Sequence, residues 1–216
     1  MRRKEFKMDA DNEETEQFLH EMSFGYLGTV SEDGIAQMTP LNYVYVRGAI
    51  YFHGSKIGEK MNAIRRNARV SFAVAKEYAI IPSYFTDPVF ACPATSFFKS
   101  VYITGTSEII DDVQEKAEAF TAFMRKLQPE GGYADIDPAD PGYAKQLKAT
   151  AVVKINVDSV NAKFKFGQNW PQSKLEAIGE QLHERGRELD AETAELMMRY
   201  CPAHRQPQSG EDIGGG

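Results

Sequence analysis

The segment FGYLGTV-SEDG-IAQMTPLNYVYV constrains the fold of this 216-residue chain more than any other stretch. Two runs rich in β-branched and aromatic residues, 24–30 and 35–46, flank four residues that end in Asp-Gly, which is typical of a tight hairpin turn. A turn at Arg47-Gly48 and a third run, AIYFH (49–53), follow directly. Strands joined by such short turns pair with their neighbours in an antiparallel manner. The sequence therefore predicts an antiparallel meander.

Three more strands and several helices follow from the periodicity of the remaining chain. RVSFAVA, FKSVYITGTSEII and TAVVKINV predict strands at 69–75, 98–110 and 150–157. Helices are expected at 13–22, at 61–66, from Asp112, and in two further segments, 173–187 and 190–200. Nothing alternates strictly as strand, helix, strand, so a doubly wound sheet is disfavoured. We expect a mainly β protein, a six-stranded antiparallel barrel with peripheral helices.

The same pattern predicts four regions along the chain. We expect an N-terminal helical segment (1–23), a barrel domain (24–166), a C-terminal helical extension (167–201) and a disordered tail (202–216). A proline-rich segment without periodicity, 82–97, is expected to be a long loop.

Charge and composition exclude several classes of function. The formal net charge of −6 disfavours binding to nucleic acid or to an anionic membrane surface. Two isolated cysteines and four scattered histidines predict no disulfide and no metal site. The N-terminus has no signal-peptide pattern, and no window has enough apolar residues to span a membrane, so a soluble, cytoplasmic protein is expected.

Pro40 interrupts the second predicted strand. Proline has no N–H to donate to a β-ladder, so this strand is expected to lie at a sheet edge or to bulge at this residue. A bulge would free main-chain groups of Thr39, Leu41 and Asn42 for a ligand. An edge proline without any role is the alternative.

The segment HGSKIGEK (53–60) contains the residue types that a phosphate site needs. It does not match the triphosphate-binding loop, because its glycines are too close together and no hydroxyl residue follows Lys60. A phosphate monoester requires only free N–H donors, a hydroxyl and cations, which Gly54, Ser55 and the start of a helix near Gly58 would supply. Lys56 and Lys60 share a face if that helix begins by Lys56. A solvated pair of surface lysines is the alternative.

Four motifs in this order carry a resemblance to a known family. They are PLNYVY (40–45), YFHGSKIGEK (51–60), AIRRNARV (63–70) and SVYITG (100–105). Together they resemble the pyridoxamine 5′-phosphate oxidase-related, FMN-binding split-barrel proteins, over roughly residues 20–165. The chain is most similar to the branch that contains the nitroimidazole-resistance proteins.

The resemblance implies a homodimer with a flavin, FMN or alternatively FAD, at the subunit interface. When the family's binding residues are matched to this sequence, the flavin phosphate would be surrounded by His53, Gly54, Ser55, Lys56 and Lys60. Thr39, Pro40, Leu41 and Asn42 would line the isoalloxazine ring. The segment FKFGQNWP (164–171) is similar to the ending of flavin-binding relatives with regulatory roles, which would place Gln168, Asn169 and Trp170 at the mouth of the cleft.

Two departures from the family pattern bear on activity. True pyridoxamine phosphate oxidases carry an R-x-x-L-L-K stretch where this chain has Gln37-Met38-Thr39-Pro40-Leu41-Asn42. The tryptophan-arginine segment with which those enzymes end is not found in this chain. The resemblance therefore implies an FMN-dependent oxidoreductase that passes electrons from NAD(P)H to a small acceptor such as a nitroaromatic or a quinone. His53 is the candidate catalytic residue. Alternatives are a flavin-binding sensor without turnover and, with His53 as ligand, a haem protein.

Overall fold

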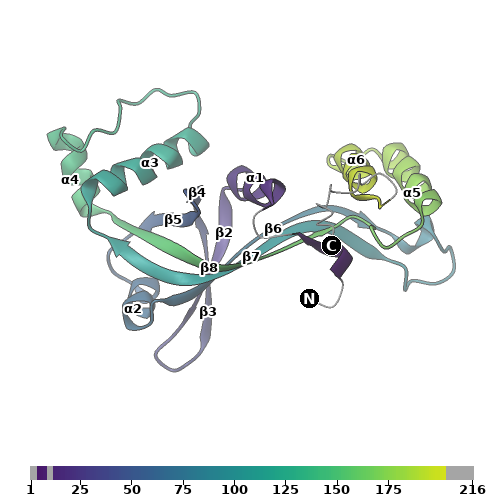
Figure 1. Ribbon diagram of the computed structural model, residues 1–216, viewed down its shortest axis with the longest axis horizontal. Coiled ribbons are helices and arrows are strands. Elements are labelled where there is room, and N and C mark those ends of the chain that lie inside the picture. Colours follow the sequence, from purple (N-terminus) through teal and green to yellow (C-terminus); the bar gives the residue numbers. More distant parts are fainter. Residues whose placement is uncertain (1–3, 9–11, 203–216) are drawn as a thin grey trace, which may run out of the picture. The chain divides into compact units, whose positions relative to one another are not determined.

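The protein is mainly an antiparallel β-sheet with peripheral helices (Figure 1), as the computed structural model describes for residues 4–8 and 12–202. The expected disordered tail lies outside the described residues from 203 onward. Eight strands form one sheet in the order β3-β2-β6-β7-β8-β5-β4, with β1 paired to β8. Their bounds are β1 Lys7–Met8, β2 Phe24–Val30, β3 Ala36–Asn42, β4 Val44–Val46, β5 Ala49–Gly54, β6 Arg69–Ile81, β7 Thr95–Ile110 and β8 Ala151–Lys165.

The expectation of a closed six-stranded barrel is corrected to an open sheet of eight described strands. One added strand arises because the predicted strand at 35–46 is divided at Tyr43. The Tyr43 N–H donates to the carbonyl of Ser23 (3.1 Å), and its buried hydroxyl donates to the carbonyl of Leu19 (2.9 Å). The first bond extends the β2–β3 register by one pair, and after Tyr43 the chain changes partner, so β3 pairs with β2 while β4 pairs with β5. The other added strand, β1, is too short to show a periodicity.

Pro40 lies in an edge strand. The strand β3 ends the sheet order, and its register with β2 runs without interruption from the pair Phe24–Asn42 to the pair Val30–Ala36. Pro40 stands opposite Tyr26 in this register. The edge placement is therefore confirmed, and no bulge occurs in β3.

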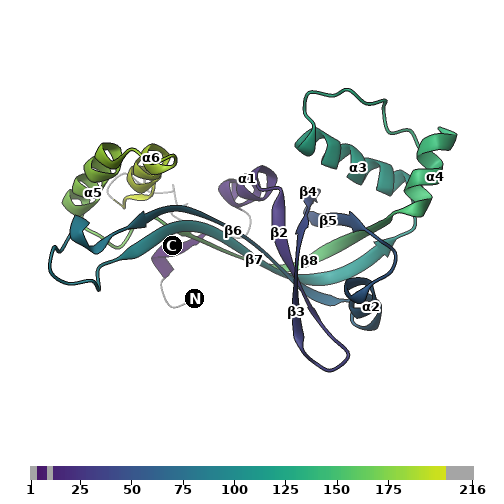
Figure 2. The same ribbon diagram turned by 180° about the vertical axis from the view of Figure 1, so that it is seen from behind.

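The α-helices of the described residues are labelled in both views of the structure (Figures 1 and 2). They are α1 Glu13–Glu21, α2 Glu59–Arg66, α3 Val113–Leu127, α4 Pro141–Ala149, α5 Gln172–Arg185 and α6 Asp190–Tyr200. The prediction missed α4, which Asp140 caps by accepting from the N–H groups of Gly142 and Tyr143. Among the described residues, no helix has both the length and the apolar composition needed to cross a membrane.

The chain forms two compact units. One comprises residues 8–75 and 100–162, and the other comprises residues 1–7, 76–99 and 163–216. In the first unit, α3 packs on β4, β5 and β8 through a buried cluster that includes Val44, Tyr51, Ile110, Phe123 and Val152. In the second unit, Phe166 stacks on Tyr200 and meets Tyr78 edge-on, each at 5.3 Å between ring centroids.

Candidate functional site

The predicted phosphate segment lies between the end of β5 and the start of α2. The helix α2 begins at Glu59, and its N-cap residue Gly58 has φ 115°, a left-handed backbone conformation that favours glycine. No side chain caps this end, so the first N–H groups of α2 are open to a ligand. Because the helix starts only after Gly58, Lys56 lies in the loop and Lys60 lies in the first turn of the helix.

Lys60 extends over the backbone of Gly54. Its ammonium nitrogen lies 3.5 Å from the point that a Cβ on Gly54 would occupy, and 5.2 Å from the centroid of the Phe52 ring. Within the described parts of the chain, this nitrogen has no hydrogen-bond or ion-pair partner from the protein. Burial lowers the pKa of Lys60, because removal of water disfavours the charged form. Lys60 is thus a half-buried cation with no counter-charge among the residues that the structure describes.

Lys56 differs from Lys60 because its ammonium group is already engaged. Lys56 Nζ donates to the carbonyl of Lys148, at the C-terminal end of α4. Arg65 fixes the loop from the other side by donating to the Lys56 carbonyl (2.7 Å). The Ser55 hydroxyl oxygen accepts from the N–H of Ile57 (3.2 Å), which leaves its own proton free to donate. The predicted lysine pair is therefore two cations with different environments.

His53 lies at the same end of β5, with its side chain against α3. The imidazole is 4.8 Å from the ring of Phe123 and 5.1 Å from the ring of Phe120, although part of it remains exposed to solvent. Burial against these rings lowers the pKa of His53, and the nearby charge of Lys60 lowers it further. The neutral imidazole is therefore the favoured form.

The four β3 residues alternate between the two faces of the sheet. Pro40 and Asn42 are exposed on one face, whereas Leu41 is buried and Thr39 is half-buried on the other. Asn42 donates its amide to the carbonyl of Ser23 (3.0 Å). Only the main chain of β3, not its four side chains together, could therefore contact one flat ring.

Gln168, Asn169 and Trp170 belong to the other compact unit, so their predicted place at the flavin cleft stays a prediction. The buried Gln168 accepts from the N–H of Phe166 (2.8 Å) and donates to the carbonyl of Phe164 (2.7 Å). Asn169 is exposed, and Trp170 packs on Phe97 at 5.5 Å. The Gln168 side chain thus stabilises a local turn with both of its polar atoms.

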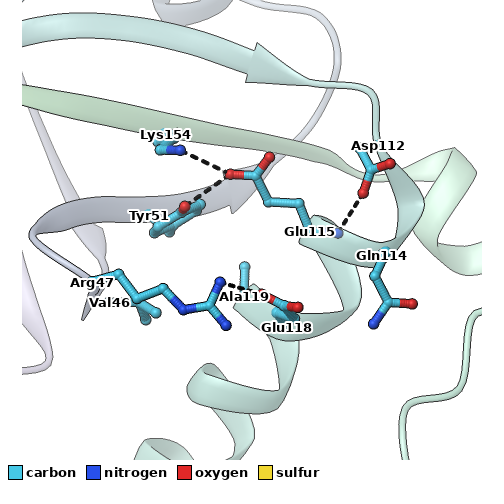
Figure 3. A pocket seen from close by; sticks show the side chains of 9 residues that line it. All are labelled: Val46, Arg47, Tyr51, Asp112, Gln114, Glu115, Glu118, Ala119 and Lys154. Carbon is cyan, nitrogen blue, oxygen red and sulfur yellow. Dashed lines mark hydrogen bonds and ion pairs between the residues drawn. The ribbon is translucent and has the colours of Figure 1, made fainter.

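The sequence did not reveal a polar cavity on the face of β5 that packs against α3 (Figure 3). This cavity, of about 310 Å³, contains the carboxylate of Glu115. Glu115 accepts from the Tyr51 hydroxyl (2.9 Å) and from Lys154 Nζ (3.1 Å). Tyr51 and Lys154 are opposite one another in the β5–β8 register. Only the tertiary fold brings Glu115 to this pair, so no local pattern could have predicted the contact.

A family model described as pyridoxamine 5′-phosphate oxidase matches residues 11–164. The chain belongs to this family. The match covers the meander, the phosphate segment and all of the first compact unit beyond residue 10, so the expected family resemblance is confirmed. The comparison with curated proteins gave no match.

Solved structures of similar fold include several flavin-related proteins. A protein assigned to 5-nitroimidazole antibiotic resistance, from Bacteroides thetaiotaomicron, is 21% identical with a TM-score of 0.56, over 73% of this chain and 86% of that chain. The flavocytochrome Anf3 from Azotobacter vinelandii is 23% identical with a TM-score of 0.59, over 71% and 67%. The FAD and haem binding protein from Mycobacterium smegmatis is 18% identical with a TM-score of 0.59, over 80% and 78%. These likenesses support the fold.

The surroundings of His53 predict that its imidazole has a pKa below the ordinary value for histidine. Its NMR-detected midpoint should lie below the ordinary value of 6.5, and Phe120→Ala should raise it more than Lys60→Met does, because burial is the larger cause. Lys145→Met, on the exposed face of α4, serves as the control and should leave the midpoint unchanged. Since the folded protein then binds fewer protons than the unfolded chain, this histidine reduces stability as the pH falls below 6.5. A midpoint at or above 6.5 would contradict this description of the site.

Proposed function

We propose that the protein is a flavin-dependent oxidoreductase whose His53–Lys60 segment binds the phosphate of the flavin mononucleotide unit, as FMN or as part of FAD. The observation that carries the proposal is Lys60, a half-buried cation beside a glycine backbone with no partner in the described chain. A phosphate dianion would supply the missing counter-charge and would accept from the open N–H groups of α2. Family membership supports the same assignment.

The residues at the site would bind and orient the cofactor. Bound FMN would supply the electron-transfer chemistry, which no side chain of this site can perform alone. Ser55 and Lys60 would fix its phosphate, and Gly54 would allow close approach of the backbone. The outer edge of β3 presents main-chain groups that do not pair with β2, and these could hydrogen-bond the polar edge of the isoalloxazine ring.

We further propose that the electrons come from NAD(P)H and pass to a small acceptor such as a nitroaromatic or a quinone. The assignment of one structural neighbour to nitroimidazole resistance supports an acceptor of this class. Pyridoxamine phosphate oxidation is disfavoured, since Gln37–Asn42 lacks the basic residues of the true oxidases. The expected electron path therefore runs from a nicotinamide nucleotide to an acceptor held beside the flavin.

A flavin-binding regulatory module without turnover is the second candidate. The environment of His53 favours it. Two phenylalanine rings and Lys60 disfavour the charged imidazole, so His53 is a poor proton donor at neutral pH. Haem binding is the third candidate, with the His53 imidazole as the ligand of the haem iron. The packing of this imidazole against α3 disfavours that role.

Removal of the Lys60 charge tests the phosphate assignment. Lys60→Ala should weaken FMN binding by about 10- to 100-fold, as expected for loss of a charge-assisted hydrogen bond. Lys56→Ala should weaken it less, because Lys56 is engaged with the carbonyl of Lys148. The measurement is quenching of flavin fluorescence on titration of apo-protein, with Lys145→Ala as the control. Equal FMN affinity in Lys60→Ala and in the wild type would refute the assignment.

We also propose that two copies of the chain associate through the exposed face of the β2–β3 hairpin. Phe24, Tyr26 and Val30 on β2 and Met38 on β3 are 43–60% exposed. The register places them on one face together with Pro40. A contiguous apolar patch of this kind is typical of a protein interface. This face borders the outer edge of β3, so a second copy would also cover the proposed place of the flavin ring.

The oligomeric state tests this interface. Light scattering should give twice the 24.2 kDa chain mass for the wild type and a single chain mass for Met38→Lys. Flavin content should fall in the same variant, because one wall of the cleft would be lost. Val89→Lys introduces the same charge at a residue that is 78% exposed outside the hairpin, and it should remain dimeric. A Met38→Lys protein that stays dimeric would exclude this face as the interface.

A further inference from the structure

A mainly apolar pocket of about 190 Å³ lies beside the phosphate segment, between α3 and α4. Phe120 and Met124 of α3 line one side of it. Tyr143 and Gln146 of α4 line the other, and Tyr133 contributes from the segment that joins the two helices. The pocket therefore combines three aromatic rings with one amide side chain.

Three contacts connect this pocket to the phosphate segment. Phe120, which lines the pocket, is the ring that packs against His53 at 5.1 Å. Gly54 pairs with Ala151, the residue that follows the pocket residue Thr150. Lys56 donates to the carbonyl of Lys148, the residue that follows the pocket residue Leu147. The pocket and the proposed phosphate site are thus neighbours within one compact unit.

The walls of the pocket are held in place by three hydrogen bonds, one of which is buried. The buried Lys116 of α3 donates to the carbonyls of Leu147 (3.1 Å) and Thr150 (3.0 Å), at the C-terminal end of α4. Tyr143 donates its hydroxyl to the carbonyl of Ala134 (2.6 Å), which ties α4 to the joining segment. The cavity is therefore preformed, which lowers the entropic cost of binding a ligand.

The position of the pocket decides which part of a ligand could reach it. This step rests on the proposed function, which places the flavin phosphate at Lys60. In a flavin the ribityl chain separates the phosphate from the reacting ring, and the isoalloxazine is expected along β3 rather than at α4. An electron acceptor must contact that ring, so the pocket beside the phosphate is poorly placed for a substrate. It is well placed for a group attached to the phosphate itself.

We propose that this pocket binds the adenine ring of FAD, so that the site accepts the dinucleotide in preference to FMN. The rings of Phe120, Tyr133 and Tyr143 offer stacking surfaces to a purine. The Gln146 amide, which has no hydrogen-bond partner among the described residues, can both donate to and accept from the edge of adenine. Lys56 lies in the phosphate segment and contacts α4. It could neutralise the second phosphate of FAD if its ammonium group left the Lys148 carbonyl for that phosphate.

Paired titrations of apo-protein with FMN and with FAD test the proposal. The wild type should bind FAD about tenfold or more tightly than FMN. Gln146→Leu should weaken FAD binding about tenfold through the lost hydrogen bonds and change FMN binding less than twofold. Gln146→Trp, at an exposed position of α4, should obstruct the pocket and weaken FAD binding further. Gln114→Leu, on the exposed surface of α3 outside this pocket, is the matched control and should change neither affinity.

The outcomes separate this inference from the function on which it rests. Equal affinity of the wild type for FMN and FAD would overturn the adenine pocket and leave the phosphate site intact. Equal weakening of both flavins by Gln146→Leu would overturn it as well. Failure of the wild type to bind either flavin would overturn the proposed function, and the adenine pocket with it. Flavin released from the purified wild type by heat and separated by chromatography should be FAD, and release of FMN alone would count against the pocket.

Discussion

Lys60 lies over the backbone of Gly54, and the proposed chemistry of the protein depends on this contact. The ammonium group lies 3.5 Å from the place of a Gly54 Cβ, an ordinary contact distance, and it has lost part of its hydration by burial beside Phe52. A desolvated cation without a counter-charge in the described part of the chain costs free energy, which supports the proposed anion at this place. Lys60 belongs to the first turn of α2, whose N-terminal N–H groups no side chain caps. Both features favour phosphate over a neutral ligand.

The second cation, Lys56, joins this site to α4. It donates to the C-terminal end of α4, where Lys116 donates as well. Two lysines at a helix C-terminus are favourable because the free carbonyls there carry partial negative charge. Their mutual repulsion and burial lower the pKa of Lys116, with burial as the larger cause. An anion beside Lys56 would relieve that repulsion, so the position of α4 and the occupancy of the phosphate site should be coupled.

Local chemistry determined which features could be predicted from the sequence. The hairpin at Asp33-Gly34 and the edge strand with Pro40 follow from backbone preferences of single residues, and both were predicted. The division at Tyr43 depends on the change of strand partner and on one hydrogen bond to the distant helix α1, so it could not be predicted. Lysine spacing left open whether Lys56 and Lys60 share a face, and the start of α2 after Gly58 decides that they do not. Pairings such as Glu115 with Tyr51 likewise exist only in the folded chain.

The visible absorption spectrum of the purified protein, before and after anaerobic addition of NADH or NADPH, tests the central claim most directly. The account predicts the two absorption bands of an oxidised flavin, bleached by at least one of the two nucleotides. Flavin bands that neither nucleotide bleaches would favour the regulatory module. A colourless protein that takes up neither FMN nor FAD, or a Soret band without flavin bands, would contradict a flavin site at Lys60.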